Sequence, residues 1–166
     1  MTLPIGGFAV AKGLGWKRFD HISLAVPNAN EAVDFYERLF GVERSHYFSS
    51  PTEGFRGAVL DMPNGQGQFE VLEPQGEDSF LTAFMERSGA GVHHITIEVE
   101  DVEAAVEYLR EEMGIEAYRG IWSDYEWKQT FIHPKDTGGV LYQLFEWLPG
   151  HGPSASPSSS AGVEES

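Results

Sequence analysis

Two segments of the chain alternate apolar and polar residues with a period of two, which is typical of strands with one buried face. In residues 21–26 the apolar face is Ile22, Leu24 and Val26, and residues 94–99 alternate in the same way. A pattern with helical spacing follows each segment. Its apolar positions are Ala32, Phe35, Tyr36, Leu39 and Phe40 in the first case and Val102, Ala105, Val106, Leu109 and Met113 in the second.

The residues that flank the two helical patterns are suited to begin and end helices. Asn28 or Asn30 can cap the first helix and Asp101 the second, because their side-chain oxygens accept hydrogen bonds from free backbone N–H groups. Gly41 and Gly114 stand where a left-handed helix end belongs. Apolar runs bounded by Gly, Pro and Asn then predict strands over residues 58–60, 68–72, 130–132 and 140–145.

These features repeat at an offset of 73 positions without a gap. The offset pairs His21 with His94, Gly41 with Gly114, Phe69 with Tyr142 and Glu73 with Glu146, among others. Because a single offset aligns the two halves of the chain, the sequence indicates a duplicated module. We therefore predict an α+β fold of two tandem βαβββ modules whose sheets curl around a shared metal-binding cavity.

The expected domain boundaries follow from the repeat and from composition. Residues 1–16 form an N-terminal extension, and residues 17–149 form the domain, with module one at about 17–90 and module two at about 91–149. Residues 150–166 are rich in Pro, Ser and Gly and carry a single β-branched residue, Val163. Such a segment buries too little apolar surface to offset its ordering entropy, so we expect a disordered tail.

Composition and charge narrow the class of protein. Cysteine is absent, which excludes disulfides, thiolate metal sites and thiol nucleophiles. The 26 acidic and 11 basic side chains give a formal charge of −15, which disfavours binding to nucleic acid. No apolar stretch reaches the ~20 residues of a membrane span, and the N-terminus does not resemble a signal peptide. We expect a cytoplasmic protein that binds neither nucleic acid nor membrane.

Four polar side chains at equivalent positions of the repeat predict a metal centre. His21 and His94 open the two modules on the face opposite the apolar set, and Glu70 and Gln143 alternate with apolar neighbours near the module ends. If the sheets enclose a cavity, all four point inward. Two imidazoles, a carboxylate and an amide oxygen suit a divalent ion such as Zn, Co, Ni, Mn or Fe(II). An uncompensated buried Glu70 would be costly, which also favours a cation.

Residues 17–148 resemble the vicinal oxygen chelate superfamily, which comprises the glyoxalase, bleomycin-resistance and dioxygenase fold. The segments FDHI at 19–22, GVHHI at 91–95 and HPKDTGGVL at 133–141 are similar to methylmalonyl-CoA epimerases. The resemblance implies that His21, Glu70, His94 and Gln143 are the metal ligands. It also implies a homodimer and a small-molecule substrate with vicinal oxygens or an acyl thioester.

Two departures from the epimerase pattern affect the assignment of the catalytic base and of the substrate. The epimerases usually carry Glu at the position of Gln143, and an amide cannot take up a proton. The resemblance places Glu53 near the epimerases' non-ligand catalytic Glu, and Glu126 is its repeat partner. These two, or the ligand Glu70, are the candidate catalytic carboxylates. Secondly, residues 121–128 are bulky and aromatic, which makes Trp122, Tyr125 and Trp127 candidate substrate-binding residues. His133 and Lys135, in the turn before the last strand, are further candidates, and Lys135 is suited to meet an anionic group.

Three functions remain open at this point. The favoured one is a divalent-metal-dependent isomerase or epimerase that removes a proton α to a metal-bound carbonyl. The first alternative is a non-haem Fe(II) extradiol dioxygenase that uses His21, His94 and Glu70, or a glyoxalase-type lyase. The second is a small-molecule-binding protein of the bleomycin-resistance type, whose members have usually lost the metal ligands.

Overall fold

The computed structural model describes residues 13–152, which fold into eight strands, three α-helices and two 3-10 turns. The expected tail and N-terminal extension lie largely outside the described residues. The first half of the chain contains β1 (Trp16–Ala25), α1 (Ala29–Phe40), β2 (Glu43–Ser50), β3 (Phe55–Asp61), β4 (Gln68–Pro74) and α2 (Phe80–Ser88). The second half contains β5 (Gly91–Val99), α3 (Val102–Met113), β6 (Tyr118–Ser123), β7 (Trp127–Ile132) and β8 (Tyr142–Trp147).

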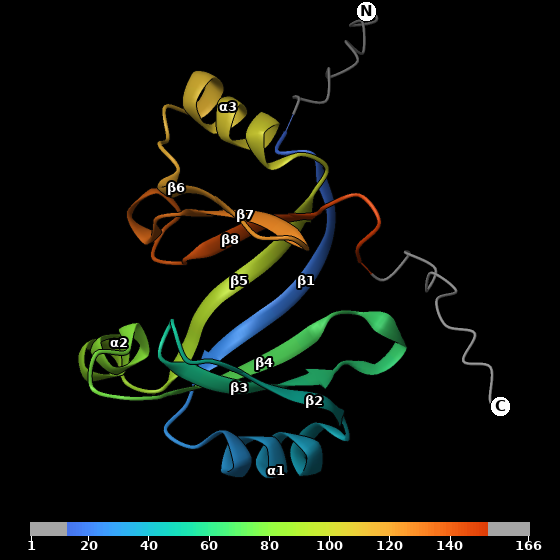
Figure 1. Ribbon diagram of the computed structural model, residues 1–166, viewed down its shortest axis with the longest axis vertical. Helices are drawn as coiled ribbons and strands as arrows, with labels where there is room; N and C mark the ends of the chain where they lie inside the picture. The colour runs from blue at the N-terminus through green and yellow to red at the C-terminus, as the bar shows by residue number, and fades with distance from the viewer. Residues whose placement is uncertain (1–12, 153–166) are drawn as a thin grey trace, which may run out of the picture.

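The eight strands form one sheet in the order β2-β3-β4-β1-β5-β8-β7-β6. β1 and β5 run antiparallel through the middle of the molecule and join the two halves. Each central strand pairs in parallel with the last strand of its own half, β1 with β4 and β5 with β8. Figure 1 shows α1 outside the lower half and α3 outside the upper half, with the strands between them. The predicted α+β duplication is confirmed.

The ends of α1 and α3 are built alike, as the sequence predicts. The side chain of Asn28 accepts hydrogen bonds from the first turn of α1, and that of Asp101 accepts one from Ala104 N. Both helices end at a glycine in the left-handed region, Gly41 and Gly114, each at φ 66°. A side chain there would be strained, so glycine fixes where each helix stops.

A glutamate at equivalent positions ties each helix to its sheet. Glu73 at the end of β4 accepts a hydrogen bond of 2.7 Å from Ala29 N, the first residue of α1. Glu146 on β8 accepts one of 2.5 Å from Val102 N, the first residue of α3. A carboxylate is favourable at a helix N-terminus because of the free N–H groups and the helix dipole. The repeat pair Glu73 and Glu146 therefore has a structural role.

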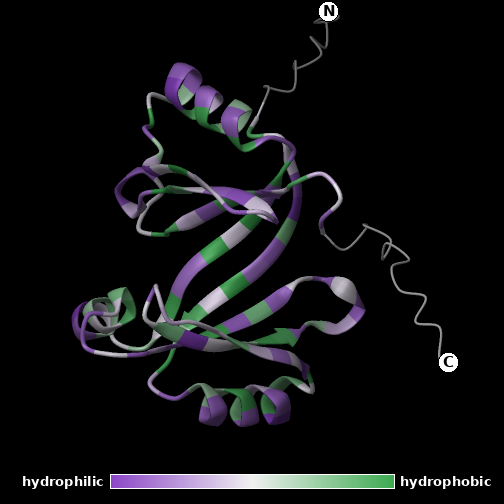
Figure 2. Ribbon diagram, viewed as in Figure 1, coloured by the Kyte–Doolittle hydropathy of each residue, from purple (hydrophilic) through white to green (hydrophobic). Residues whose placement is uncertain are grey.

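Each module has its own apolar core between its helix and the outer face of the sheet. Leu24, Val33, Leu60 and Val71 belong to the first core, and Ile97, Val102, Leu109 and Leu144 to the second. Along β1 and β5, Figure 2 shows hydrophobic and hydrophilic residues alternating. The apolar positions of β1 thus pack toward α1, and His21 and Ser23 face the other way, between the two halves.

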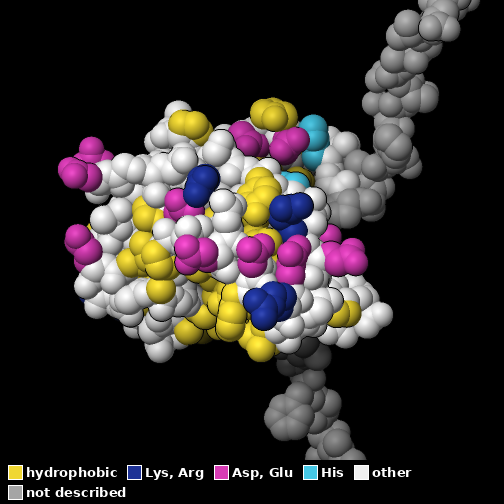
Figure 3. Space-filling model, turned by 90° about the horizontal axis from the view of Figure 1, so that it is seen from below, with side chains coloured by type: hydrophobic (Ala, Val, Ile, Leu, Met, Phe, Trp, Pro, Cys, Tyr) yellow, Lys and Arg dark blue, Asp and Glu magenta, His cyan; other side chains and the backbone are white. Residues whose placement is uncertain are grey.

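The stripe predicted for α1 is not its buried face. Ala32 and Tyr36 are partly buried and Phe35, Leu39 and Phe40 are 57%, 55% and 52% exposed, whereas the buried residues of the helix are Ala29 and Val33, which the prediction did not include. Figure 3, seen from the α1 side, shows hydrophobic side chains at the surface among acidic ones. Met113 at the end of α3 is also exposed. The sheet covers only the side of α1 that carries Val33, so the edge of the helix's apolar face is exposed to solvent.

No helix within residues 13–152 is both long and apolar enough to cross a membrane.

Candidate metal centre

The strand register brings the four predicted ligands together between the two halves of the sheet. Ser23 lies opposite His94 across β1 and β5, and His21 lies opposite Thr96. Glu70 stands beside Ser23 on β4, and Gln143 stands beside Thr96 on β8. The ligand atoms of His21, Glu70 and His94 all lie within 4.8 Å of one another.

Gln143 joins this group through its amide oxygen. Its Oε1 lies 3.1 Å from Nε2 of His94 and accepts a hydrogen bond of 2.7 Å from the Thr96 hydroxyl. Its amide nitrogen donates to Oε1 of Gln129 on β7, which turns the oxygen toward the histidines. The amide oxygen of Gln143 therefore points where a fourth ligand would be needed.

Two hydroxyl groups, which the sequence analysis did not single out, connect the four side chains. Ser23 donates to Glu70 and lies 3.1 Å from Nε2 of His94, while Thr96 lies 2.8 Å from Nε2 of His21. Ser23 and Thr96 are both fully buried. They are also partners in the 73-residue repeat, which is the signal that could have revealed them.

The donor set fits a divalent ion. Burial, with the nearby charges of His21 and His93, holds the pKa of His94 well below its usual value, so His94 is neutral and able to bind a metal. Burial opposes the charging of His21, but the hydrogen bond to Asp20 and the charge of Glu70 outweigh it and raise its pKa. Imidazole, carboxylate and amide donors are the ligands that Zn, Mn, Co, Ni or Fe(II) take in such sites.

A second group of acidic residues does not have this character. Asp101, Glu103 and Glu146 also bring carboxylate oxygens together. Asp101 and Glu146 already accept hydrogen bonds from the start of α3. Lys128 pairs with Glu103 at 2.7 Å and with Glu146 at 3.1 Å. These oxygens are occupied by donors of this chain, so the cluster is structural.

The other predicted site residues lie on the turns and on the last strands. Glu53 is exposed and accepts a hydrogen bond from Ser50, whereas Glu126 is half-buried. In Figure 1 the turn between β2 and β3 rises toward the upper half, and the turn between β6 and β7 is its counterpart in the second module. The structure thus holds the two carboxylates on equivalent turns but in different surroundings.

Among the predicted substrate-binding residues, the aromatic ones are unequally exposed. Trp122 and Tyr125 are 50% and 76% exposed, whereas Trp127 packs edge-on against Trp147 at 5.8 Å between ring centroids. His133 caps the turn that contains Lys135 by accepting a hydrogen bond from Lys135 N. Its ring packs edge-on against Tyr118, and Lys135 is exposed.

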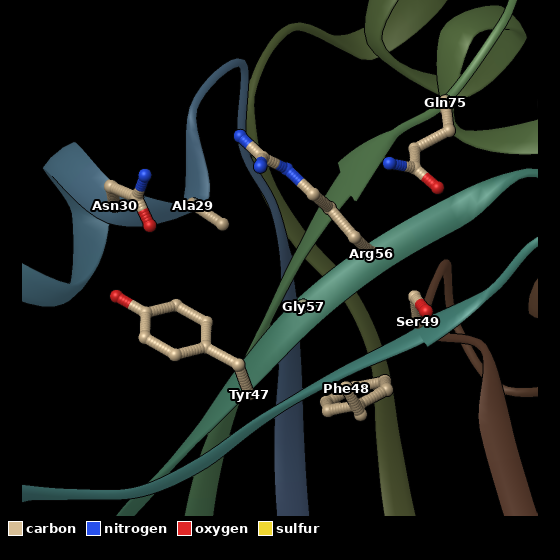
Figure 4. A pocket seen from close by; sticks show the side chains of 8 residues that line it. All are labelled: Ala29, Asn30, Tyr47, Phe48, Ser49, Arg56, Gly57 and Gln75. Atoms are coloured by element: carbon tan, nitrogen blue, oxygen red, sulfur yellow. The ribbon is translucent and has the colours of Figure 1, made fainter.

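A hollow of about 420 Å³ lies away from the metal centre, between α1 and the β2–β3 hairpin. Figure 4 shows Arg56 reaching from β3 toward α1, with Tyr47 below Asn30 in this view. Arg56 is neutralised by Glu73 at 2.8 Å, so the hollow has no free positive charge from this residue. Its lining residues are Ala29, Asn30, Tyr47, Phe48, Ser49, Arg56, Gly57 and Gln75.

Comparison with known proteins identifies the family. A family model for the glyoxalase/bleomycin resistance protein/dioxygenase superfamily matches residues 20–125. The chain therefore belongs to this superfamily, as its repeat and its fold indicate. Among its relatives is the mitochondrial methylmalonyl-CoA epimerase of Mus musculus, 35% identical over 136 residues, 78% of this chain and 74% of that protein. The ethylmalonyl-CoA/methylmalonyl-CoA epimerase of Cereibacter sphaeroides is 33% identical over 76% of this chain and 96% of its own.

Solved structures agree with these relatives. The methylmalonyl-CoA epimerase of Mycobacterium tuberculosis superposes with a TM-score of 0.73 at 29% identity, over 86% of this chain and 95% of that one. A methylmalonyl-CoA epimerase in complex with methylmalonyl-CoA and NH4+ gives 0.69 at 32% identity, over 83% and 99%. The predicted superfamily and the resemblance to methylmalonyl-CoA epimerases are confirmed.

The partly buried imidazole of His93 makes stability depend on pH. Burial, followed by the charges of Arg119 and Arg87, lowers its pKa from 6.5 to about 4. As the pH falls, His93 is therefore protonated in the unfolded chain before it is protonated in the folded one. This difference lowers the free energy of unfolding by about 2 kcal/mol between pH 7 and pH 5. His21, whose pKa is raised, acts in the opposite direction: the stability that it adds is present at low pH and is lost as the pH rises through its folded pKa.

Urea unfolding of the metal-free protein at the two pH values measures this effect. We expect His93→Phe to be less sensitive to pH than the wild type by about the same 2 kcal/mol. An equal loss of stability in both proteins would show that His93 does not take part.

Proposed function

We propose that this protein is a divalent-metal-dependent epimerase of a small acyl-CoA thioester, of the methylmalonyl-CoA type. One observation carries the proposal: a centre of two imidazoles, one carboxylate and one amide oxygen lies between the halves of a chain that is 30–35% identical to methylmalonyl-CoA epimerases. A bleomycin-resistance-type binder has no need of such a donor set.

In this proposal His21, Glu70, His94 and Gln143 hold the metal. The ion, when bound, supplies Lewis-acid chemistry that stabilises negative charge on a substrate carbonyl oxygen. Ser23 and Thr96 hold the ligand side chains in place through the hydrogen bonds described above. Gln129 keeps the amide of Gln143 from turning its NH₂ group toward the site.

Inversion at a carbon α to a carbonyl requires a proton to leave from one face and return to the other. Glu53 and Glu126 are suited to this because they stand on equivalent turns of the two modules. One carboxylate would take the α-proton from one face of the substrate, and the acid form of the other carboxylate would return a proton to the opposite face. Glu70 is the alternative, as a ligand whose carboxylate already lies within the centre.

The direct test is α-proton exchange in deuterated water. Metal-loaded protein is incubated with methylmalonyl-CoA, and the loss of the α-proton signal is followed by NMR. The proposal expects exchange and inversion to be abolished by a chelator and restored by metal. Oxygen uptake with a catechol, without exchange, would instead support a dioxygenase. Substrate binding with neither reaction would support a binding protein.

Two arginines near the centre are candidates to meet the phosphates of a CoA ester. Arg87 lies in the last turn of α2, and Arg119 lies on β6. The positive charges of both contribute to the lowered pKa of His93, which adjoins His94. No ion pair of either arginine is found within residues 13–152, whereas Arg56, Arg110 and Lys128 pair with carboxylates. Arg119 also adopts φ 66°, which is unusual for a residue other than glycine. In a chain of charge −15, unpaired cations favour an anionic ligand.

Replacing Arg87 or Arg119 by Ala is expected to raise KM for the CoA ester about 5-fold each, with kcat little changed, because an exposed phosphate contact is worth about 1 kcal/mol. The matched control is Arg110→Ala on α3. A short thioester without the nucleotide should show no difference among the variants. Equal KM values for the CoA ester in all four proteins would refute this role.

A further inference from the structure

We propose that Asp20, held by Arg18, is a positioning residue that fixes the ring of His21, and that the two histidine ligands are therefore supported in chemically different ways. This inference rests on the metal centre of the proposed function. It concerns residues outside the ligand set, for which the sequence alone predicts no role.

A chain of charged contacts leads from the protein surface to His21. Asp20 Oδ1 lies 2.7 Å from Nδ1 of His21, and its other oxygen, Oδ2, lies 2.5 Å from Arg18. The Nε atom of Arg18 donates to Glu98 at 2.6 Å, and Lys17 pairs with the same carboxylate. Glu98 is only 4% exposed, so the arginine is anchored to a fixed point.

These contacts determine which way the imidazole of His21 faces. A carboxylate only accepts, so Nδ1 of His21 carries the hydrogen and donates it to Asp20. The opposite nitrogen, Nε2, then faces Thr96 at 2.8 Å and Glu70 at 3.6 Å, inside the centre. The ring is held through Nδ1, which leaves the lone pair of Nε2 directed into the centre, at the position that a metal would take.

His94 has a different neighbour at the equivalent position. The repeat offset of 73 places His93 where Asp20 stands in the first module. Nδ1 of His93 lies 2.8 Å from Nδ1 of His94, and its ring packs against Phe84 and Phe80 of α2 at 4.9 and 5.3 Å. The first histidine is thus supported by an anion and the second by an imidazole among aromatic rings.

The difference has a consequence for metal binding. A carboxylate partner fixes the tautomer of a histidine ligand and makes its free nitrogen a better donor, and losing such a partner typically weakens metal affinity 10- to 100-fold. We expect the metal affinity of Asp20→Ala to be lower than that of the wild type by a factor within this range. Asp20→Asn should lose less, because its carbonyl still accepts from Nδ1.

Titration with Co²⁺, followed by visible absorption and calorimetry, measures the affinity of the full chain and of both variants. Asp34→Asn on the exposed face of α1 is the matched control for the lost charge. The second readout is the imidazole nitrogen NMR spectrum of metal-free protein at alkaline pH. The wild type and Asp34→Asn should show a single tautomer of His21 with the hydrogen on Nδ1, and Asp20→Ala a mixture.

Equal Co²⁺ affinities in Asp20→Ala, Asp20→Asn and Asp34→Asn, with the same His21 tautomer, would overturn the inference. Thermal unfolding of each variant shows whether it is folded, and Asp20→Asn decides the matter if Asp20→Ala is not. Failure of the proposed metal centre gives a different result, because the wild type would then bind no Co²⁺ while the tautomer of His21 still depended on Asp20. Failure of the proposed epimerase reaction alone, with the metal centre intact, would leave both readouts as expected here.

Discussion

His94→Ala is expected to bind no divalent ion. Its rate of α-proton exchange should fall by roughly 10²–10³-fold or more, because stabilisation of charge at the reacting oxygen is worth that much. His94 is the most enclosed of the ligands, with its Nε2 between Ser23 and Gln143. Alanine offers no nitrogen there, and the remaining donors leave one side of the centre open. Metal content by plasma mass spectrometry, together with the exchange rate, measures the effect.

The matched control is His46→Ala, which removes an exposed imidazole on β2 outside the centre. It should keep about one ion per chain and the wild-type rate. If His94→Ala retained both the ion and the rate, the centre described here would not be the site of the reaction.

Replacing the candidate bases separately distinguishes a mechanism with two bases from one with a single base. With two bases on opposite faces, Glu53→Gln should lower the rate of inversion by about 10²–10⁴-fold. It should still permit exchange of the α-proton in one epimer. Glu126→Gln should permit it in the other epimer. The measurement is deuterium incorporation into each epimer supplied separately, with chirality analysed at early times.

Glu70→Gln provides the contrasting case. It keeps an oxygen donor for the metal but cannot accept a proton, so a reaction in which Glu70 is the base would lose exchange in both epimers while the metal stays bound. In that case Glu53→Gln and Glu126→Gln would behave like the wild type. Loss of exchange only in Glu70→Gln would exclude the two turn carboxylates as bases.

The sequence predicted the candidate ligands because they obey two independent regularities. His21 and His94 lie on the polar side of strands that alternate strictly, and the repeat makes them equivalent, as it does Glu70 and Gln143. The register of β1 with β4 and of β5 with β8 then brings the four side chains together. Alternation and duplication are properties of the sequence itself, so they can be recognised without the structure.

Other features depend on contacts that the sequence does not reveal. β2 and β6 are edge strands exposed over most of their length, and therefore lack the alternation that marks a half-buried strand. α2 has no counterpart in the second module, so the repeat did not indicate it. Asp20 and His93 are equivalent in position but different in chemistry, and only the structure shows that each contacts a candidate ligand histidine.

The measurement that tests the central claim most directly is anomalous diffraction at the cobalt edge from crystals of Co²⁺-loaded protein. We predict one strong peak per chain between β1, β4, β5 and β8, at about 2.0–2.2 Å from the ring nitrogens of His21 and His94 and from oxygens of Glu70 and Gln143. A peak at Asp101, Glu103 and Glu146 instead, or no peak within the domain, would contradict the account.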